Sequence, residues 1–100
     1  MRWRLSGPAN RDIIQIYTQG VEHFGFAQVE KHLDELNAVF DRIAVYPQLG
    51  RLRHEVAPPA RMIPFRSHLI FYDIGEEEIL ILRIRHGFED WWSESSSGDR

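Results

Sequence analysis

Two long stretches of the chain repeat apolar side chains at the spacing of an α-helix. The first opens at Ser6-Gly7-Pro8, which suits an N-cap followed by a proline in the first turn, and it stops at Gly25. Its apolar stripe consists of Ala9, Ile13, Ile16, Tyr17 and Val21. The second runs from about Ala27 to Tyr46 and is ended by Pro47. Its stripe consists of Val29, Leu33, Leu36, Phe40 and Ile43. The short connection predicts an antiparallel helical hairpin.

Other segments show the pattern of β-strands. Met1–Leu5 alternates polar and apolar side chains, as a half-buried strand does. Arg61–Phe65 is a further short strand, in which Pro64 favours an edge position or a bulge. His68–Ile74 and Glu78–His86 are strongly apolar runs on either side of an acidic turn, which predicts a hairpin.

The order of these segments predicts the fold class. Residues 48–59 show no period and contain one glycine and two prolines, so we expect a loop there. The last strand is apolar on both faces as far as Leu82, which favours a central position. The predicted order is therefore β-α-α-β-β-β. We expect an α+β fold in which the helical hairpin packs on one face of a small, mainly antiparallel sheet.

The length and composition of the chain narrow its class. A length of 100 residues suits one domain, which we place at residues 1–92, with residues 93–100 as a frayed polar tail. The apolar runs are far shorter than the roughly 20 residues that span a bilayer, and no secretory leader is visible, so we expect a cytoplasmic protein without a membrane partner. The absence of cysteine excludes a disulfide scaffold, a thiol nucleophile and a cysteine-ligated zinc site.

The basic residues are unusual in kind, because eleven of the twelve are arginine while the net charge is −3. Alternation places Arg83 and Arg85 on one face of the last strand. The opposite face of that strand is predicted to carry Leu80, Leu82, Ile84 and His86. If the apolar side of the first strand faces the helices, Arg2 and Arg4 join the two other arginines in a cationic floor on the open face. Such a floor suits RNA phosphate or a carboxylate-rich partner. The alternative is a solvated face with local salt bridges.

Evidence for catalytic or metal chemistry is weak. The five histidines are His23, His32, His54, His68 and His86. They form no His-Glu-x-x-His motif and no helical pair four residues apart, so we expect no metal and no cofactor. Ser67 and His68 point to opposite faces of a strand, and no glycine-rich phosphate loop is present. Near the C-terminus, Phe88, Trp91 and Trp92 either fold back onto the core or mark a surface that binds a protein.

Four blocks of the sequence resemble the RelE/ParE toxin superfamily, and within it the ParE branch. In the order of the family they are Leu5–Ala9 with Asp12-Ile13, Phe40–Arg53 with Glu55-Val56, Arg61–Pro64 with His68–Tyr72, and Ile81–Gly87 with Asp90. The more specific parts are Pro-x-x-Gly-Arg at residues 47–51 and Arg-x-x-His-Gly at residues 83–87.

The resemblance implies a toxin of a type II toxin–antitoxin system, of a kind associated with plasmid stabilisation and with the poisoning of DNA gyrase. The resemblance implies that the protein forms a hetero-oligomer with a ParD-like antitoxin. It also implies that the toxin acts by binding its target rather than by catalysis. Specific DNA binding by the toxin itself is not implied. We expect the acidic tail of that antitoxin to meet Arg51, Arg53, Arg61, Arg83 and Arg85. Phe88, Trp91 and Trp92 are candidates for contact with the target.

Two alternatives stay open. A RelE-like, ribosome-dependent mRNA endoribonuclease would use Arg61 and Arg83 on the phosphate transition state, with His86 as acid or base. The lysine-rich helix of such enzymes is missing, and no tyrosine follows Tyr72, so both departures favour the gyrase branch. The second alternative is a non-toxic module that binds an antitoxin or takes part in autoregulation.

Overall fold

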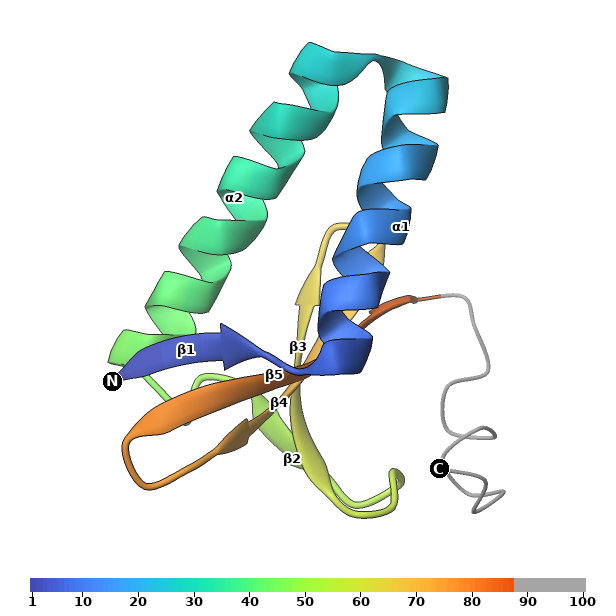
Figure 1. Ribbon diagram of the computed structural model, residues 1–100. Coiled ribbons are helices and arrows are strands. Elements are labelled where there is room, and N and C mark those ends of the chain that lie inside the picture. Colours follow the sequence, from blue (N-terminus) through green and yellow to red (C-terminus); the bar gives the residue numbers. More distant parts are fainter. Residues whose placement is uncertain (88–100) are drawn as a thin grey trace.

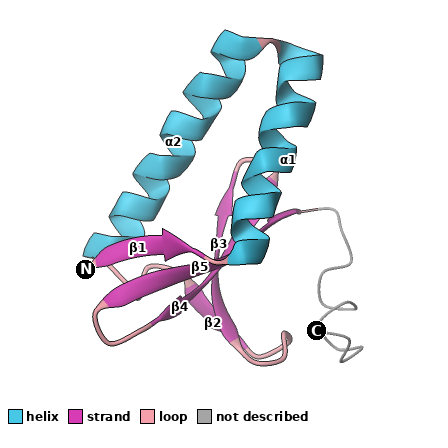
Figure 2. Ribbon diagram, in the orientation of Figure 1, coloured by secondary structure: helices cyan, strands magenta, loops and turns pink. Residues whose placement is uncertain are grey.

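The computed structural model describes residues 1–87, which form a five-stranded sheet with two helices standing over one of its faces (Figure 1). The elements in chain order are β1 (Arg2–Leu5), α1 (Gly7–Phe24), α2 (Phe26–Val45), β2 (Arg51–Arg53), β3 (Ala60–Phe65), β4 (His68–Ile74) and β5 (Glu78–His86). In this part of the chain both helices lie on the same face of the sheet and no helix covers the other face, which confirms the expected α+β architecture (Figure 2).

The helical hairpin forms where the apolar periodicity predicts it. Ser6 caps α1 by accepting a hydrogen bond from the backbone N–H of Ala9 at 3.0 Å. Gly25 separates the helices and has a φ of 86°, a left-handed value that glycine adopts without a steric penalty. Among the described residues, neither helix is long and apolar enough to cross a membrane.

The first and last strands of the described chain, β1 and β5, lie side by side, with β1 at an edge of the sheet. Its order is β1-β5-β4-β3-β2, so β5 is central, as its two apolar faces predict. β1 pairs with β5 in parallel, while β5–β4, β4–β3 and β3–β2 are antiparallel. The sheet is therefore mixed and mostly antiparallel.

One strand lies inside the segment expected to be a loop. Arg51–Arg53 forms β2 and pairs with β3 over Ala60–Met62. Three residues are too few to show a two-residue period, and for this reason the sequence did not reveal the strand. The pairing ends before Pro64, which lies where β3 is matched by β4 alone, so its missing N–H leaves no gap against β2.

The main core lies between the helices and the sheet. Its largest fully buried side chains are Leu36, Phe40, Ile43, Ile70, Tyr72, Ile79 and Ile81. Trp3 packs against Phe40 with 4.8 Å between ring centres, and its indole N–H donates to Asp41 at 2.8 Å. The apolar side of β1 therefore faces the helices, as expected.

A bulge in β5 changes which side chains share a face. Tyr72 pairs with Ile81 while Phe71 pairs with Arg83, so Leu82 is an extra residue. As a result Leu82 packs with Phe71 on the open face, whereas Ile84 returns to the core under the helices. The prediction that Leu82 and Ile84 share a face is wrong, because the bulge shifts the alternation by one residue.

Candidate functional site

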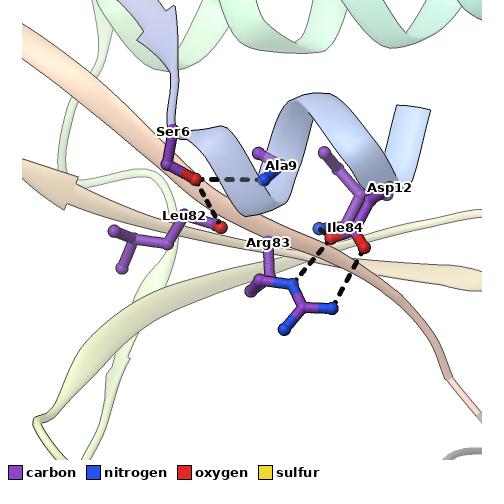
Figure 3. A network of polar contacts seen from close by, with 6 residues as sticks. All are labelled: Ser6, Ala9, Asp12, Leu82, Arg83 and Ile84. Atoms are coloured by element: carbon purple, nitrogen blue, oxygen red, sulfur yellow. Dashed lines mark hydrogen bonds and ion pairs between the residues drawn. The ribbon is translucent and has the colours of Figure 1, made fainter. Parts of the chain in front are cut away.

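The start of α1 is fastened to the edge of β5 that β1 leaves free (Figure 3). The backbone N–H of Ser6 donates to the carbonyl oxygen of Ile81 at 2.9 Å. The hydroxyl of Ser6 donates to the carbonyl oxygen of Leu82 at 2.8 Å while it caps α1. One small side chain thus fixes where the helix begins relative to the central strand.

Asp12 continues this attachment one turn later (Figure 3). Its carboxylate accepts from the backbone N–H of Ile84 at 2.9 Å and from two nitrogens of Arg83 at 2.8 and 3.0 Å. The Asp12 side chain is only 12% exposed and that of Arg83 is 39% exposed. Arg83, which the sequence offers for antitoxin binding or phosphate chemistry, is therefore engaged within the fold.

The Pro-x-x-Gly-Arg block forms a turn held by Tyr72 and Arg61. The Tyr72 hydroxyl donates to the carbonyl oxygen of Pro47 and accepts from the backbone N–H of Gly50, both at 2.7 Å. Arg61 donates to the carbonyl oxygen of Gly50 at 2.8 Å. A Cβ at position 50 would lie 2.8 Å from the Tyr72 ring, so glycine is required there. Burial raises the pKa of the Tyr72 phenol, which keeps its proton for the bond to Pro47.

The open face of the sheet has an apolar centre. Its buried members are Val56, Ala60 and Phe71, with Met62, Leu69 and Leu82 packed around them. Val56 belongs to the segment between β2 and β3, so this segment folds onto the face instead of extending into solvent. The centre is a second, smaller core on the side opposite the helices.

Three of the predicted arginines border this apolar centre. Residues paired across a ladder share a face, and Arg51 pairs with Met62, Arg53 with Ala60 and Arg85 with Leu69. Arg51 is exposed. Arg53 binds the Glu55 carboxylate with a shortest contact of 2.6 Å, which lowers the pKa of Glu55 to about 2.

The expected continuous cationic floor is thus replaced by an apolar strip with arginines at its margins. Arg2 and Arg4 are exposed and project from the side of β1 that faces away from the helices. Arg4 forms a 2.6 Å ion pair with Glu78, so a local salt bridge accounts for this residue.

Only two of the three residues of the ribonuclease hypothesis are brought together, because Arg83 and His86 line one cavity of about 390 Å³ while Arg61 does not. Arg61 pairs with Tyr72, whereas His86 pairs with His68, four positions away along β4. At about 3.3 Å per residue, these two positions are roughly 13 Å apart along the sheet. Arg83 turns to Asp12 at the far edge of β5. No common point for a reacting phosphate follows from this arrangement.

Two residues with important contacts were not singled out by their chemistry in the sequence. Tyr72 stands in an apolar strand, and a buried tyrosine needs a partner for its hydroxyl, which is a usable signal. Asp12 gives no such signal, because its partners are more than 70 positions away. Phe88, Trp91 and Trp92, and the proposed tail at 93–100, lie outside the described residues.

Known proteins are similar to this chain over most of its length. Residues 3–91 match the family model described as ParE toxin of type II toxin-antitoxin system, parDE. Toxin ParE1 of Mycobacterium tuberculosis (strain ATCC 25618 / H37Rv) is 34% identical over 86 residues, which is 85% of this chain and 88% of that protein. Toxin ParE3 of Caulobacter vibrioides is 28% identical over 80 residues, or 80% of each chain. The solved structure of the chromosomal ParDE TA system from P. aeruginosa has the same fold, with a TM-score of 0.70 at 21% identity over 86% of this chain and 95% of that one.

Proposed function

Because this chain belongs to the ParE toxin family of type II toxin–antitoxin systems, we propose that it acts in the cytoplasm by binding DNA gyrase and is neutralised by a ParD-like antitoxin. The observation that supports binding rather than catalysis is that Arg61 lies apart from Arg83 and His86 and that both arginines are bonded within the fold. Arg61 is bonded to Gly50 and Arg83 is bonded to Asp12, and His86 lines a cavity beside Arg83 but not beside Arg61. Two of the three groups needed for phosphate chemistry are already engaged.

The antitoxin segment is proposed to cross the open face of the sheet. Apolar side chains of the segment would cover the centre around Phe71 and Met62, which packs against the buried residues there. Its carboxylates would lie near Arg51, Arg53 and Arg85 at the margins of that centre. Arg61 and Arg83 support the fold beneath this surface through their own intramolecular bonds.

The antitoxin part of the proposal is tested by calorimetric titration with the cognate antitoxin at two salt concentrations. Arg51→Ala is the informative variant, because Arg51 is exposed and its loss should leave the isolated fold unchanged. Truncating one member of a pair that a partner desolvates costs about 2–5 kcal/mol, so we expect affinity to fall about 30-fold or more. The loss should change little with salt, since a covered pair is poorly screened.

Arg11→Ala is the matched control, because Arg11 is an exposed arginine on α1, away from the open face. Its affinity for the antitoxin should stay at the wild-type value. Equal losses for both variants, or a loss for Arg51→Ala that vanishes in high salt, would argue against docking on the open face.

The target is tested by induction of the protein in cells that lack the antitoxin. We expect filamentation, an SOS response and gyrase-linked DNA breaks while translation continues. Rapid cleavage of mRNA at ribosomal A-sites with intact DNA would instead support the endoribonuclease. Normal growth combined with tight antitoxin binding would support the non-toxic module.

A further inference from the structure

A group of apolar side chains is exposed at the end of α2 that lies farthest from the turn between the helices (Figure 1). Val45 and Tyr46 are 65% and 63% exposed, and Leu49 and Ile74 are 43% and 39% exposed. Val45 ends α2, Tyr46 and Leu49 belong to the segment before β2, and Ile74 ends β4. Single exposed apolar side chains are ordinary, whereas a contiguous group of them marks a contact surface.

These side chains surround one groove. The groove has a volume of about 430 Å³ and is lined by residues 45–49 together with Ile74. Apart from Gln48 and the hydroxyl of Tyr46, the side chains that line it are apolar. A groove of this kind accepts apolar side chains of a partner, because they leave water when they enter it.

The backbone beneath the groove is held by hydrogen bonds. The N–H of Tyr46 donates to the carbonyl oxygen of Arg42 at 2.8 Å, and the N–H of Leu49 donates to the carbonyl oxygen of Tyr46 at 2.9 Å. The carbonyl oxygen of Pro47 accepts from the Tyr72 hydroxyl at 2.7 Å. The groove is therefore ordered before a partner arrives, which lowers the entropic cost of binding.

The charges beside the groove are mainly acidic. Within residues 41–49 and 73–77, four acidic side chains are accompanied by one basic side chain, Arg42. The acids are Asp41, Asp73, Glu76 and Glu77. Glu76 and Glu77 are exposed in the turn between β4 and β5, and neither forms an ion pair with another described residue. This end of the molecule therefore suits a basic partner.

The open face of the sheet has the opposite character. Its apolar centre is bordered by Arg51, Arg53 and Arg85, which suit the acidic segment of an antitoxin. The acids beside the groove would repel the same segment, because like charges brought together across an interface are unfavourable. The groove and the open face are thus suited to partners of opposite charge.

We propose that the groove is the contact surface for the target, and that it takes a segment of DNA gyrase in which apolar side chains are accompanied by lysine or arginine. The apolar side chains would enter between Tyr46, Leu49 and Ile74. The cations would lie beside Glu76 and Glu77. This inference rests on the proposed action on gyrase, and it adds which part of the described chain makes the contact.

The test is a calorimetric titration of the purified full chain into purified gyrase, with gyrase-dependent DNA cleavage as a second readout. We expect affinity to fall about tenfold or more in Tyr46→Ala, because a tyrosine buried at the centre of an interface carries much of its binding energy, and by a smaller factor in Leu49→Ala. Phe24→Ala is the matched control, since Phe24 is also exposed but lies at the other end of α2, about 30 Å away at 1.5 Å per residue. Its affinity for gyrase should stay at the wild-type value.

The acidic side of the groove is tested by the double variant Glu76→Lys with Glu77→Lys. We expect weaker binding of gyrase, by a factor that shrinks at high salt, because exposed charges are screened. The control is Glu22→Lys with Glu30→Lys, which changes the net charge equally at two exposed positions near the turn between the helices. Equal losses in the two double variants would overturn the proposal, because they would show that net charge attracts gyrase.

Antitoxin affinity, thermal melting and oligomeric state are measured for the same variants, and all should match wild type. If wild type does not bind gyrase, the proposed function and this inference both fail. If wild type binds and Tyr46→Ala binds equally well, the groove is overturned while action on gyrase stands. An equal loss of antitoxin binding in Tyr46→Ala would assign the groove to the antitoxin. A toxin dimer that Tyr46→Ala dissociates would assign it to a second copy, and either result would overturn the proposal.

Discussion

At the scale of single residues, Asp12 shows how a side chain can take the place of a neighbouring strand. β1 ends at Leu5, and the backbone N–H of Ile84 on β5 is then satisfied by the Asp12 carboxylate. The same carboxylate binds Arg83 through two nitrogens. Hydrogen bonds to a charged group contribute about 1.5–3 kcal/mol, more than those between neutral groups. Asp12 therefore joins helix and sheet through bonds of the stronger kind.

We predict that Asp12→Ala lowers the free energy of unfolding by about 2–3 kcal/mol, because it leaves Ile84 and Arg83 without their acceptor. Asp12→Asn should lose less, since its amide oxygen can still accept from the Ile84 N–H. Chemical denaturation measures both. Arg4→Gln is the control, because its exposed ion pair with Glu78 should contribute at most about 1 kcal/mol. Equal stability of Asp12→Ala and wild type would show that the carboxylate does not hold this junction.

A second prediction at this scale concerns the titration of Glu55. Its hydrogen bonds to Arg53 hold its pKa at about 2, below the ordinary value of 4.5. A depressed carboxyl pKa contributes stability above the unfolded value, and this contribution is lost as the pH falls from 4.5 toward 2. NMR titration of the Glu55 side-chain carbon should show the low pKa, and Arg53→Gln should raise it toward 4.5. A wild-type pKa near 4.5 would mean that the pair does not form in solution.

At the scale of the elements, α2 carries more of the core than α1. Leu36, Phe40 and Ile43 of α2 are at most 1% exposed, while Ala9 is the one residue of α1 classed as buried. Phe40 also packs against Trp3 of β1, so α2 is in direct contact with the edge of the sheet. The second helix is therefore the one whose apolar stripe is most sensitive to substitution.

Phe40→Ala should lower the free energy of unfolding by about 3–5 kcal/mol, because it opens a cavity beneath α2. Phe24→Ala removes the same number of atoms from a side chain that is 72% exposed, and it should change stability by about 0.5 kcal/mol or less. Thermal melts followed by circular dichroism compare the two. If both variants melt together, the assignment of Phe40 to the core is incorrect.

The elements also show what the sequence could and could not predict. The helices were found because each repeats its apolar stripe over several turns, and the β4–β5 hairpin because both strands are long. The sequence did not predict β2, because Arg51–Arg53 is too short to show a strand period. It did not predict the bulge at Leu82 either, because no residue type marks an extra position in an apolar run. The arginines of the candidate site were visible in the sequence. The side chains that bind these arginines could not be predicted from the sequence, because Asp12 and Arg83 come into contact only in the folded chain.

At the scale of the whole molecule, the structure has two regions that differ in burial. One is the middle of the sheet around β5, and the other is the turn between the two helices. β5 lies between β1 and β4, and its side chains Ile79, Ile81 and Ile84 are buried under the helices, while those on its other face are partly buried. The hairpin turn between the helices projects away from the sheet (Figure 1), and Phe24 and Phe26 beside it are 72% and 56% exposed. Regions with few buried apolar contacts open at lower free energy than the centre of a sheet.

Amide hydrogen exchange should follow this division. We expect the slowest exchange in β4 and β5, at rates set by global unfolding, and much faster exchange in the last turn of α1 and the first turn of α2. Exchange measured residue by residue by NMR would show the gradient. Equal protection of residues around Gly25 and of β5 would indicate that the whole molecule opens only as a unit.

The parallel pairing of β1 with β5 also has a consequence during synthesis on the ribosome. Ser6 is bonded to Leu82, 76 positions later, so the first strand has no partner until nearly all of the described chain has been made. Contacts of such long sequence separation slow the closing of a fold. A nascent chain that stops before Glu78 lacks the central strand, and with it Leu82 of the apolar centre and Arg85 at its margin. Unfinished copies are thus unable to present the surface that the completed protein carries.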